Sequence, residues 1–160
     1  MAEIKQTDRV ERVLKDAWQC CKEYRHEFIM PEHLLLALLS GNYFYEALME
    51  YASPQDLADR LNEYLQQQET VPTGVDYKPE GSAQFGKVIE TACQQVLQSS
   101  AQAVDVPHLV MGILHLEESW ACYLLKEALG GEESNFMSLL VSFCEYDDHA
   151  DDAEGKSEAA

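Results

Sequence analysis

Positive charge is scarce in this sequence, which has 11 Lys and Arg residues against 29 Asp and Glu residues and a formal net charge of -18. A field of that sign repels phosphate backbones, which disfavours nucleic acid as a partner. Long apolar runs are missing as well, because none approaches the roughly 18 to 20 residues that a membrane-spanning helix needs. The opening residues, MAEIKQ, lack the apolar core of a secretory signal. We therefore expect neither a nucleic acid nor a membrane as a partner.

Proline and glycine are also few, with five and eight residues, and the apolar fraction of 46% is that of an ordinary globular protein. The cysteines are odd in number and form no C-x-x-C pair, and most of them occupy apolar helical positions: Cys20, Cys21, Cys93, Cys122 and Cys144. Buried free thiols are the best interpretation of this pattern. Free thiols favour a reducing, cytoplasmic compartment.

Catalytic and metal-binding motifs are absent from the sequence. It has no G-x-x-x-x-G-K-[ST] loop for nucleotide phosphates and no H-x-x-x-H or H-E-x-x-H pair for a metal ion. His33 and His108 lie at the start of predicted helices, where we expect their rings to hydrogen-bond the adjoining turn and not to bind a metal ion. Adventitious metal binding at His26 remains an alternative. Cys20 and Cys21 have no neighbouring base and no electropositive niche, which a nucleophilic thiol requires. We expect no catalytic residue, no cofactor and no metal site.

A shift of 75 residues aligns the chain with itself without a gap. The matched positions are mostly apolar and include Val13 with Val88, Ala17 with Ala92, Leu34 with Leu109, Ala37 with Gly112 and Tyr45 with Trp120, together with His33 and His108. Apolar positions agree while polar positions drift, as expected for two copies of one packing unit. The sequence therefore predicts an internal duplication.

Each copy has the apolar spacing of four helices, and no segment alternates with the period of two that strands require. In the first copy, a helix that begins at Pro31 is apolar almost all round and should be central and buried. It ends at Gly41-Asn42, and Ser53 caps the fourth helix. In the second copy, Ser82 and Asp105 cap the first two helices, and residues 130–131, both glycine, end the third. The predicted fold class is all-α, with two tandem four-helix repeats related by a pseudo-two-fold axis.

The boundaries follow from composition. We expect an N-terminal lead over residues 1–7, the first repeat over 8–67, a connector over 68–81, the second repeat over 82–144 and an acidic tail over 145–160. The connector holds two prolines and two glycines, which is typical of a link and not of a helix. The tail carries seven acidic residues and no large apolar residue after Tyr146, which predicts a disordered end or linker.

Residues 24–39, YRHEFIMPEHLLLALL, resemble the Clp N-terminal domain, and the run from Arg25 to Phe28 is closest to the branch found in ClpA-type unfoldases. The second copy supports this resemblance through Phe85, Val88 and Ala92 and through residues 121–126, ACYLLK. The similarity extends over about residues 8–144. It implies a mobile, non-catalytic domain ahead of two AAA+ ATPase modules, which this sequence does not contain. In that family the full machine unfolds proteins and threads them into the ClpP peptidase.

The same resemblance implies partners and site residues. The partners would be a ClpS-like adaptor, unfolded or N-degron protein substrates, and ClpP through the absent ATPase modules; alone, the domain should be monomeric. The adaptor-binding residues would be Glu27, Glu32, Ser82 and Lys87. From the residues alone, both glutamates should be exposed, although Glu32 could simply complement a helix N-terminus and the N-cap role explains Ser82 by itself.

Two alternatives remain beside this interpretation. One is the N-domain of a ClpC- or ClpB-type chaperone with other adaptors or direct substrate capture, which the Arg25–Phe28 stretch argues against. The other is a stand-alone helical enzyme or thiol sensor, for which the sequence offers no catalytic constellation. One departure bears on the site: Met30 stands where the second copy has Asp105, and a methionine cannot cap a helix. Entry into the helix therefore relies on Pro31 and Glu32.

Overall fold

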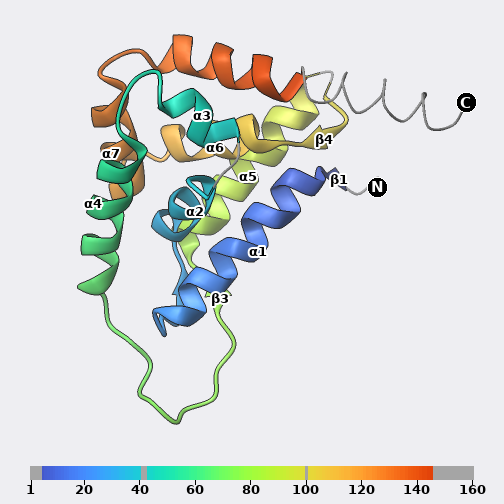
Figure 1. Ribbon diagram of the computed structural model, residues 1–160. Coiled ribbons are helices and arrows are strands. Elements are labelled where there is room, and N and C mark those ends of the chain that lie inside the picture. Colours follow the sequence, from blue (N-terminus) through green and yellow to red (C-terminus); the bar gives the residue numbers. More distant parts are fainter. Residues whose placement is uncertain (1–4, 41–42, 100, 146–160) are drawn as a thin grey trace, which may run out of the picture.

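The computed structural model describes residues 5–40, 43–99 and 101–145, and these residues form a predominantly helical protein (Figure 1). The helices are α1 (Asp8–Glu23), α2 (Pro31–Leu38), α3 (Tyr43–Leu48), α4 (Pro54–Gln66), α5 (Ala83–Gln98), α6 (Val106–His115), α7 (Trp120–Leu129) and a last helix over 133–145. The all-α class expected from the sequence is confirmed. Part of the predicted lead, the Gly41-Asn42 helix end and the acidic tail beyond residue 145 lie outside the described residues.

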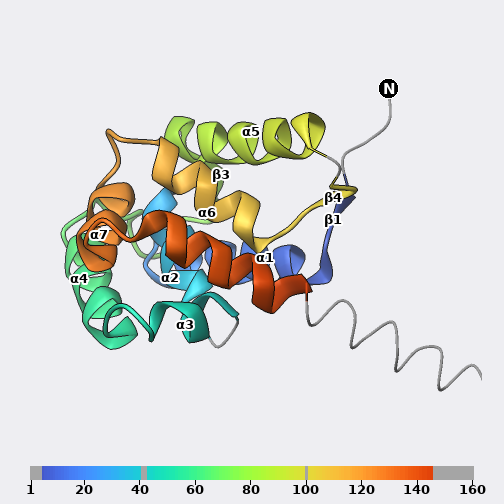
Figure 2. The same cartoon turned by 90° about the horizontal axis from the view of Figure 1, so that it is seen from above.

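The helices recur at the 75-residue offset seen in the sequence. Under this shift α1 and α5 coincide at both ends, and α2 and α6 begin at equivalent residues. The first two helices of each copy pack on one another, α1 on α2 and α5 on α6. Seen from above, α6 lies between α5 and the last helix (Figure 2). The molecule is therefore built from two alike four-helix units, as predicted.

Four strands of two residues each were not predicted: β1 (Lys5–Gln6), β2 (Phe28–Ile29), β3 (Glu80–Gly81) and β4 (Ala103–Val104). They form two parallel pairs, with Lys5 opposite Ala103 in one and Phe28 opposite Glu80 in the other. The 75-residue shift converts the first pairing into the second, so each copy lends one strand to the other. A two-residue strand is too short to show a period-two pattern, which is why periodicity missed it. The exchanged strands obey the predicted pseudo-two-fold relation.

The core lies along α2 and α6. Every residue of α2 except Leu36 is buried, which confirms the prediction that this helix is central. The two copies also meet through Phe44 of α3 and Phe136 of the last helix, whose rings make an edge-to-face contact at 5.6 Å between centroids. Each fully buried side chain of this kind stabilises the fold by about 1.5 to 3 kcal/mol. Within the described residues, no helix has the length and apolar composition to span a membrane.

Helix ends follow the side chains that the sequence offers. The Ser53 and Ser82 hydroxyls accept the backbone N–H groups of residues 56 and 85, and Gly130 ends α7 in the left-handed conformation with φ 56°. These three ends confirm the sequence-based caps. Thr7 and Ser119 cap α1 and α7 in the same way, and the sequence analysis missed both.

The connector is tied to the end of α1 by Arg25. This residue has a positive φ of 59°, and its guanidinium donates hydrogen bonds to the carbonyls of Val71, Pro72 and Val75. The backbone N–H of Val71 in turn donates to the Arg25 carbonyl at 2.7 Å. The long loop at the bottom of Figure 1 is therefore held against the body of the first copy. Its glycines and prolines indicated a connector, but its anchor, Arg25, lies 46 residues before Val71 in the sequence.

Candidate protein-docking surface

Two of the expected site residues meet at the β2–β3 pair, where the two copies join. The backbone N–H of Glu80 donates to the Glu27 carbonyl at 3.1 Å, and the N–H of Ser82 donates to the Ile29 carbonyl at 2.9 Å. The side chains of Glu27 and Glu80 are exposed, and Phe28 is 45% exposed beside them. We call Glu27, Phe28, Glu80, Ser82 and Lys87 the β2–β3 surface. The structure thus brings together residues 52 or more positions apart.

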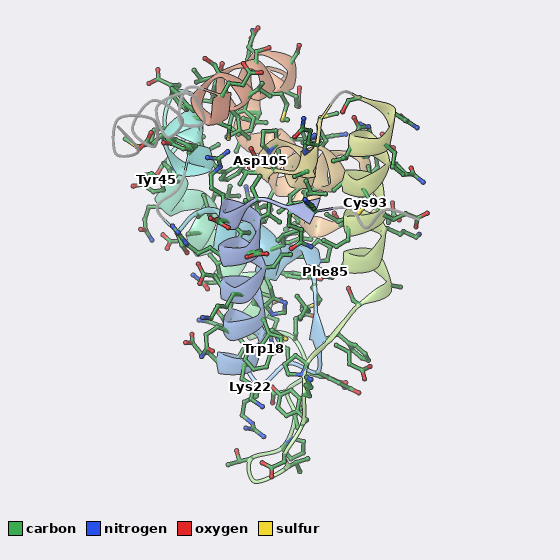
Figure 3. The ribbon with its side chains drawn as sticks, turned by 90° about the vertical axis from the view of Figure 1, so that its right-hand side faces the viewer. Trp18, Lys22, Tyr45, Phe85, Cys93 and Asp105 are labelled. Carbon is green, nitrogen blue, oxygen red and sulfur yellow. The ribbon has the colours of Figure 1, made fainter. Side chains whose placement is uncertain are left out.

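Ser82 precedes α5, which starts from this strand pair, and Lys87 lies on that helix. The Ser82 hydroxyl accepts the N–H of Phe85 at 3.0 Å and so caps the helix. Lys87 lies one turn further along and its ammonium group is 3.4 Å from a carboxylate oxygen of Glu118. Both side chains of this ion pair are more than half exposed, so the pair adds little stability and the lysine stays accessible to a partner. Figure 3 marks the position through Phe85, at the start of α5.

Glu32 is not exposed, so the expectation that both glutamates lie on the surface is wrong for this residue. Its side chain is 1% exposed, and its Oε2 accepts the backbone N–H of Ala121 at 2.9 Å, in the first turn of α7. Burial raises the pKa of this carboxyl, and the N–H groups of Ala121 and of Glu32 itself oppose the shift. The carboxylate therefore joins the N-termini of α2 and α7, one from each copy, where the helix dipoles favour a negative charge. The sequence placed Glu32 at the N-terminus of its own helix, but it gave no sign of the contact with α7.

The opposite strand pair, β1–β4, is closed by a cluster of side chains around Asp105. Arg9 donates to both carboxylate oxygens, with Nε to Oδ1 at 3.2 Å and Nη2 to Oδ2 at 2.7 Å, and the Thr7 hydroxyl donates to Oδ1 at 3.1 Å. Asp105 also accepts the N–H of Val106 at 2.8 Å, at the start of α6. We call these three side chains the Asp105 clip. It ties the first helix of one copy to the second helix of the other.

This clip has no counterpart at the β2–β3 surface. The residues equivalent to Thr7, Arg9 and Asp105 under the 75-residue shift are Ser82, Gln84 and Met30. Neither Gln84 nor Met30 carries a charge, so a bidentate ion pair cannot form there. The pseudo-two-fold fold therefore has one end closed by the Asp105 clip and one end where Ser82, Gln84 and Met30 stand in its place. The uncapped start of α2, which the sequence identified at Met30, belongs to the second end.

The two repeat-mate histidines act as the sequence predicted. His33 Nδ1 accepts the N–H of Met30 at 2.9 Å, and His108 Nδ1 accepts the N–H of Asp105 at 2.8 Å. His33 Nε2 lies 2.9 Å from His26 Nδ1 in the buried interior. Burial, and secondarily the charge of His26, lowers the pKa of His33 to about 3. Burial also lowers the pKa of His26, so both rings are neutral near pH 7. His33 uses both of its ring nitrogens inside the fold, and His26 uses its Nδ1.

A family model for the Clp repeat (R) N-terminal domain matches residues 5–128. The chain belongs to this family. The match covers the first copy, both strand pairs and the second copy through most of α7, so it includes the strand exchange described above. It stops before the last helix, which spans residues 133–145.

Solved Clp N-terminal domains have the same fold. The Hsp104 N-terminal domain from Candida albicans superposes with a TM-score of 0.73 at 18% identity, over 87% of this chain and 91% of that one. The N-terminal domain of the chaperone ClpD from Arabidopsis thaliana gives 0.64 at 15% identity, over 88% and 97%. The N-terminal domain of ClpV1 ATPase from E. coli EAEC Sci1 T6SS gives 0.65 at 21%, over 84% and 83%. At these identities the likeness establishes the architecture.

The cysteines of this Clp N-terminal domain are all free: Cys20, Cys21, Cys93, Cys122 and Cys144. Burial, with the charge of Glu23 second, raises the pKa of Cys20 to about 12, and burial raises that of Cys21 to about 11. A thiol with a raised pKa is not ionised near pH 7, so neither sulfur is an activated nucleophile. Among the described residues, no three His, Cys, Asp or Glu side chains gather in a way that could hold a metal ion.

The domain also has an open groove in its second copy, which sequence reasoning did not predict. It encloses about 1150 Å³ between α6, α7 and the last helix. Its floor is apolar, and its rim carries both signs of charge: Met111, Leu114, Met137 and Val141 below, with His108, His115, Glu117, Lys126 and Glu133 around them. All of these residues except Glu117, which lies between α6 and α7, come from three helices that the sequence placed in one copy. The hollow itself depends on the angles between those helices, which no local pattern reports.

Proposed function

We propose that this Clp N-terminal domain is the non-catalytic docking module of a ClpA-like AAA+ unfoldase and binds a ClpS-like adaptor through the β2–β3 surface. The observation that supports the proposal is the difference between the two ends of the pseudo-two-fold fold. At the β1–β4 end, Arg9 and Asp105 pair with each other in the Asp105 clip. The β2–β3 end leaves Glu27 and Glu80 exposed around Phe28.

The chemistry of this surface suits a basic adaptor. An apolar centre with a charged rim is the usual anatomy of a protein interface. Here Phe28 would supply the apolar contact, and the carboxylates of Glu27 and Glu80 would attract lysines or arginines and raise the association rate. Lys87 would supply a single positive charge at the edge, which helps to fix orientation. Glu32 would not touch the adaptor. It would support the surface from the interior by holding α2 and α7 in place.

The wider setting follows from the same proposal. The adaptor would deliver N-degron or unfolded substrates to ATPase modules that follow this domain in a longer protein, and these modules would pass them to a ClpP peptidase. The protein would work in the cytoplasm of a bacterium. Its five free thiols suit the reducing conditions of that compartment. The domain would be monomeric by itself, and any ring would be formed by the ATPase modules.

The adaptor-docking proposal predicts a charge-dependent complex. Replacing Glu27 with lysine should weaken binding of the ClpS-like adaptor from the same organism about tenfold, because it puts a positive charge where the adaptor needs a negative one. Lys87→Glu should weaken binding less, about threefold, because Lys87 lies at the edge. Both affinities can be measured by titration calorimetry with the complete chain, at low and at high salt.

Glu11→Lys is the matched control. It makes the same charge change on an exposed residue of α1, at the end of that helix remote from β2, and should leave the adaptor affinity unchanged. Equal weakening by Glu11→Lys and Glu27→Lys would show a general effect of net charge and remove the β2–β3 surface from the interface. Unchanged affinity in both variants would have the same consequence. Charge reversal of the buried Glu32 is unsuitable because it would unfold the domain.

A second candidate function is direct capture of unfolded substrate segments, as in a ClpC- or ClpB-type chaperone, and the open groove favours it. An apolar floor with polar sides is typical of sites that take extended or helical peptides. Met111→Glu, which puts a charge on the floor, should weaken binding of a permanently unfolded protein such as reduced, carboxymethylated α-lactalbumin about tenfold.

Fluorescence anisotropy of the labelled unfolded protein would give these affinities. The control is Met49→Glu, directly after α3, because Met49 is an equally flexible methionine that is 58% exposed and lies outside the groove. An unfolded protein that binds both variants as tightly as the natural chain would exclude capture in the groove. Binding of the adaptor should be insensitive to both substitutions, so the two candidate functions are separable.

A further inference from the structure

Three aromatic rings form a ladder on the outer surface of α4 and α7. The ring centroids of Tyr64 and Trp120 are 5.9 Å apart with 27° between their planes, and those of Trp120 and Tyr123 are 4.9 Å apart with 21°. Trp120 is 39% exposed and Tyr123 is 52% exposed. Tyr64 comes from the first copy of the duplication and the other two rings from the second. We call these three side chains the aromatic ladder.

The ladder is not part of the core. The inner face of α7 is formed by Ala121, Cys122, Leu124 and Leu125, which are all buried, whereas Trp120 and Tyr123 point away from it at a spacing of three residues. Stacking of Tyr64 on Trp120 joins α4 to α7, and a pair of rings is worth about 0.5 to 1.5 kcal/mol beyond burial. Tyr123 adds nothing to that junction. It stands at the end of the ladder and is the most exposed of the three rings.

The helices that carry the ladder are acidic. Together α4 and α7 hold four carboxylates, Asp56, Asp59, Glu63 and Glu127, against the two cations Arg60 and Lys126, a difference of two negative charges. Glu127 lies one turn beyond Tyr123 on α7 and pairs with Arg60 at 3.1 Å across the two helices. The whole chain carries a net charge of -18. A ligand of the ladder should therefore be positively charged.

We propose that the aromatic ladder is a docking site for a basic protein partner, which presents an arginine as a fourth step on the ring of Tyr123. A guanidinium is planar and cationic, so it stacks on an aromatic face and is attracted by the ring at the same time. Glu127 is in place to accept its N–H groups. Tryptophan and tyrosine with arginine are also the residues most often decisive at protein interfaces.

Other ligands that stack on aromatic rings fit less well. Nucleobases stack on such ladders in single-strand binding proteins, but those sites are lined with positive charge. The negative charge of this chain repels the phosphates that accompany every base. Lysine lacks the flat group that would continue the stack. The proposal is independent of the adaptor function, because no ring of the ladder belongs to the β2–β3 surface.

The chain offers a direct probe, because it contains only two tryptophans. Trp18 is packed against the core from α1 and Trp120 is in the ladder, so the two indole N–H signals in a 1H–15N NMR spectrum report separately on each place. Capped peptides of alternating glycine with arginine, lysine or glutamate are the ligands. The arginine peptide should shift the Trp120 signal and leave that of Trp18 in place. The lysine peptide should bind about threefold more weakly, and the glutamate peptide should not bind.

Two variants complete the test. Tyr123→Ala should weaken the arginine peptide about five- to tenfold, because it removes the last ring. Tyr45→Ala is the control: Tyr45 is the repeat mate of Trp120, is 37% exposed on α3, and has no place in the ladder. An unmoved Trp120 signal, equal affinity for arginine and lysine, or equal weakening by both variants would overturn the proposal. A Trp120 signal that moves with protein concentration and no peptide would replace it with self-association.

Discussion

Replacing Asp105 with alanine should lower the free energy of unfolding by about 2 to 4 kcal/mol, one of the largest effects that a single substitution can have in this domain. The carboxylate takes part in two kinds of interaction at once. It caps α6, and it accepts hydrogen bonds from Nε and Nη2 of Arg9, whose side chain is 16% exposed. Alanine would remove the carboxylate that binds the partly buried guanidinium and would open the start of α6. Figure 3 shows the position of Asp105 in the upper part of the molecule.

A conservative variant separates these contributions. Asp105→Asn keeps an oxygen that can cap α6 but removes the charge opposite Arg9, so it should lower the free energy of unfolding by only about 1 to 2 kcal/mol. Urea unfolding followed by circular dichroism at pH 7 would give both values. If the two variants are equally stable, the ion pair accounts for the whole effect. If neither differs from the natural chain, the clip does not hold the two copies together.

The pH dependence of the same variants has a definite sign. Burial alone would raise the pKa of Asp105, but the hydrogen bond and charge of Arg9, the N–H of Val106 and the Thr7 hydroxyl outweigh it, so the pKa lies below its usual value of 3.8. The stabilisation is then fully present above the unfolded pKa and is lost as the pH falls through the lower folded pKa. The difference in stability between the natural chain and Asp105→Asn should therefore shrink below about pH 4. Buried groups such as His33 and Glu32 also titrate on acidification, but they are common to both proteins and cancel in this difference.

The duplication could be predicted because it lies in the part of the sequence that packing constrains most. Pairs such as Val13 with Val88 fill equivalent core positions, so their apolar character is preserved while exposed residues change. Caps such as Ser53 and Ser82 could be predicted for a similar reason, since their partners are three residues away. In both cases the interaction that shapes the structure is local or repeats at a fixed offset.

What could not be predicted depends on contacts between the two copies. Glu32 was expected to be exposed, yet its partner Ala121 is 89 residues further along and nothing near Glu32 indicates it. The same holds for Arg9 and Asp105, which are 96 residues apart. The strand exchange needs only two residues from each copy, too few to leave a pattern. The sequence did show one sign of the asymmetry between the two ends of the fold, which is that Met30 is equivalent to Asp105. Only the structure shows the consequence, because it places Arg9 and Thr7 against Asp105.

One difference between the copies, Ala37 in the first and Gly112 in the second, reflects how closely the helices approach. A Cβ atom added to Gly112 would lie 2.6 Å from the backbone oxygen of Val88 and 2.9 Å from its Cγ1. A backbone atom of α5 cannot move aside alone, so α5 and α6 would have to separate. In the first copy, the equivalent residue, Ala37, is accommodated in the core of the domain and is 4% exposed. The second helix pair therefore depends on glycine where the first does not.

Gly112→Ala should consequently lower the free energy of unfolding by about 1 to 3 kcal/mol, even though alanine is the better helix former by about 1 kcal/mol. Gly86→Ala, on α5, is the matched control, because a Cβ at Gly86 would meet no atom within 4 Å. It should raise the free energy of unfolding by about 0.5 to 1 kcal/mol through helix propensity alone. Thermal unfolding of the two variants should shift in opposite directions from that of the natural chain. If both variants unfold at a higher temperature than the natural chain, α5 and α6 lie further apart than the 2.6 Å contact implies. That result would disprove the close packing of the second copy.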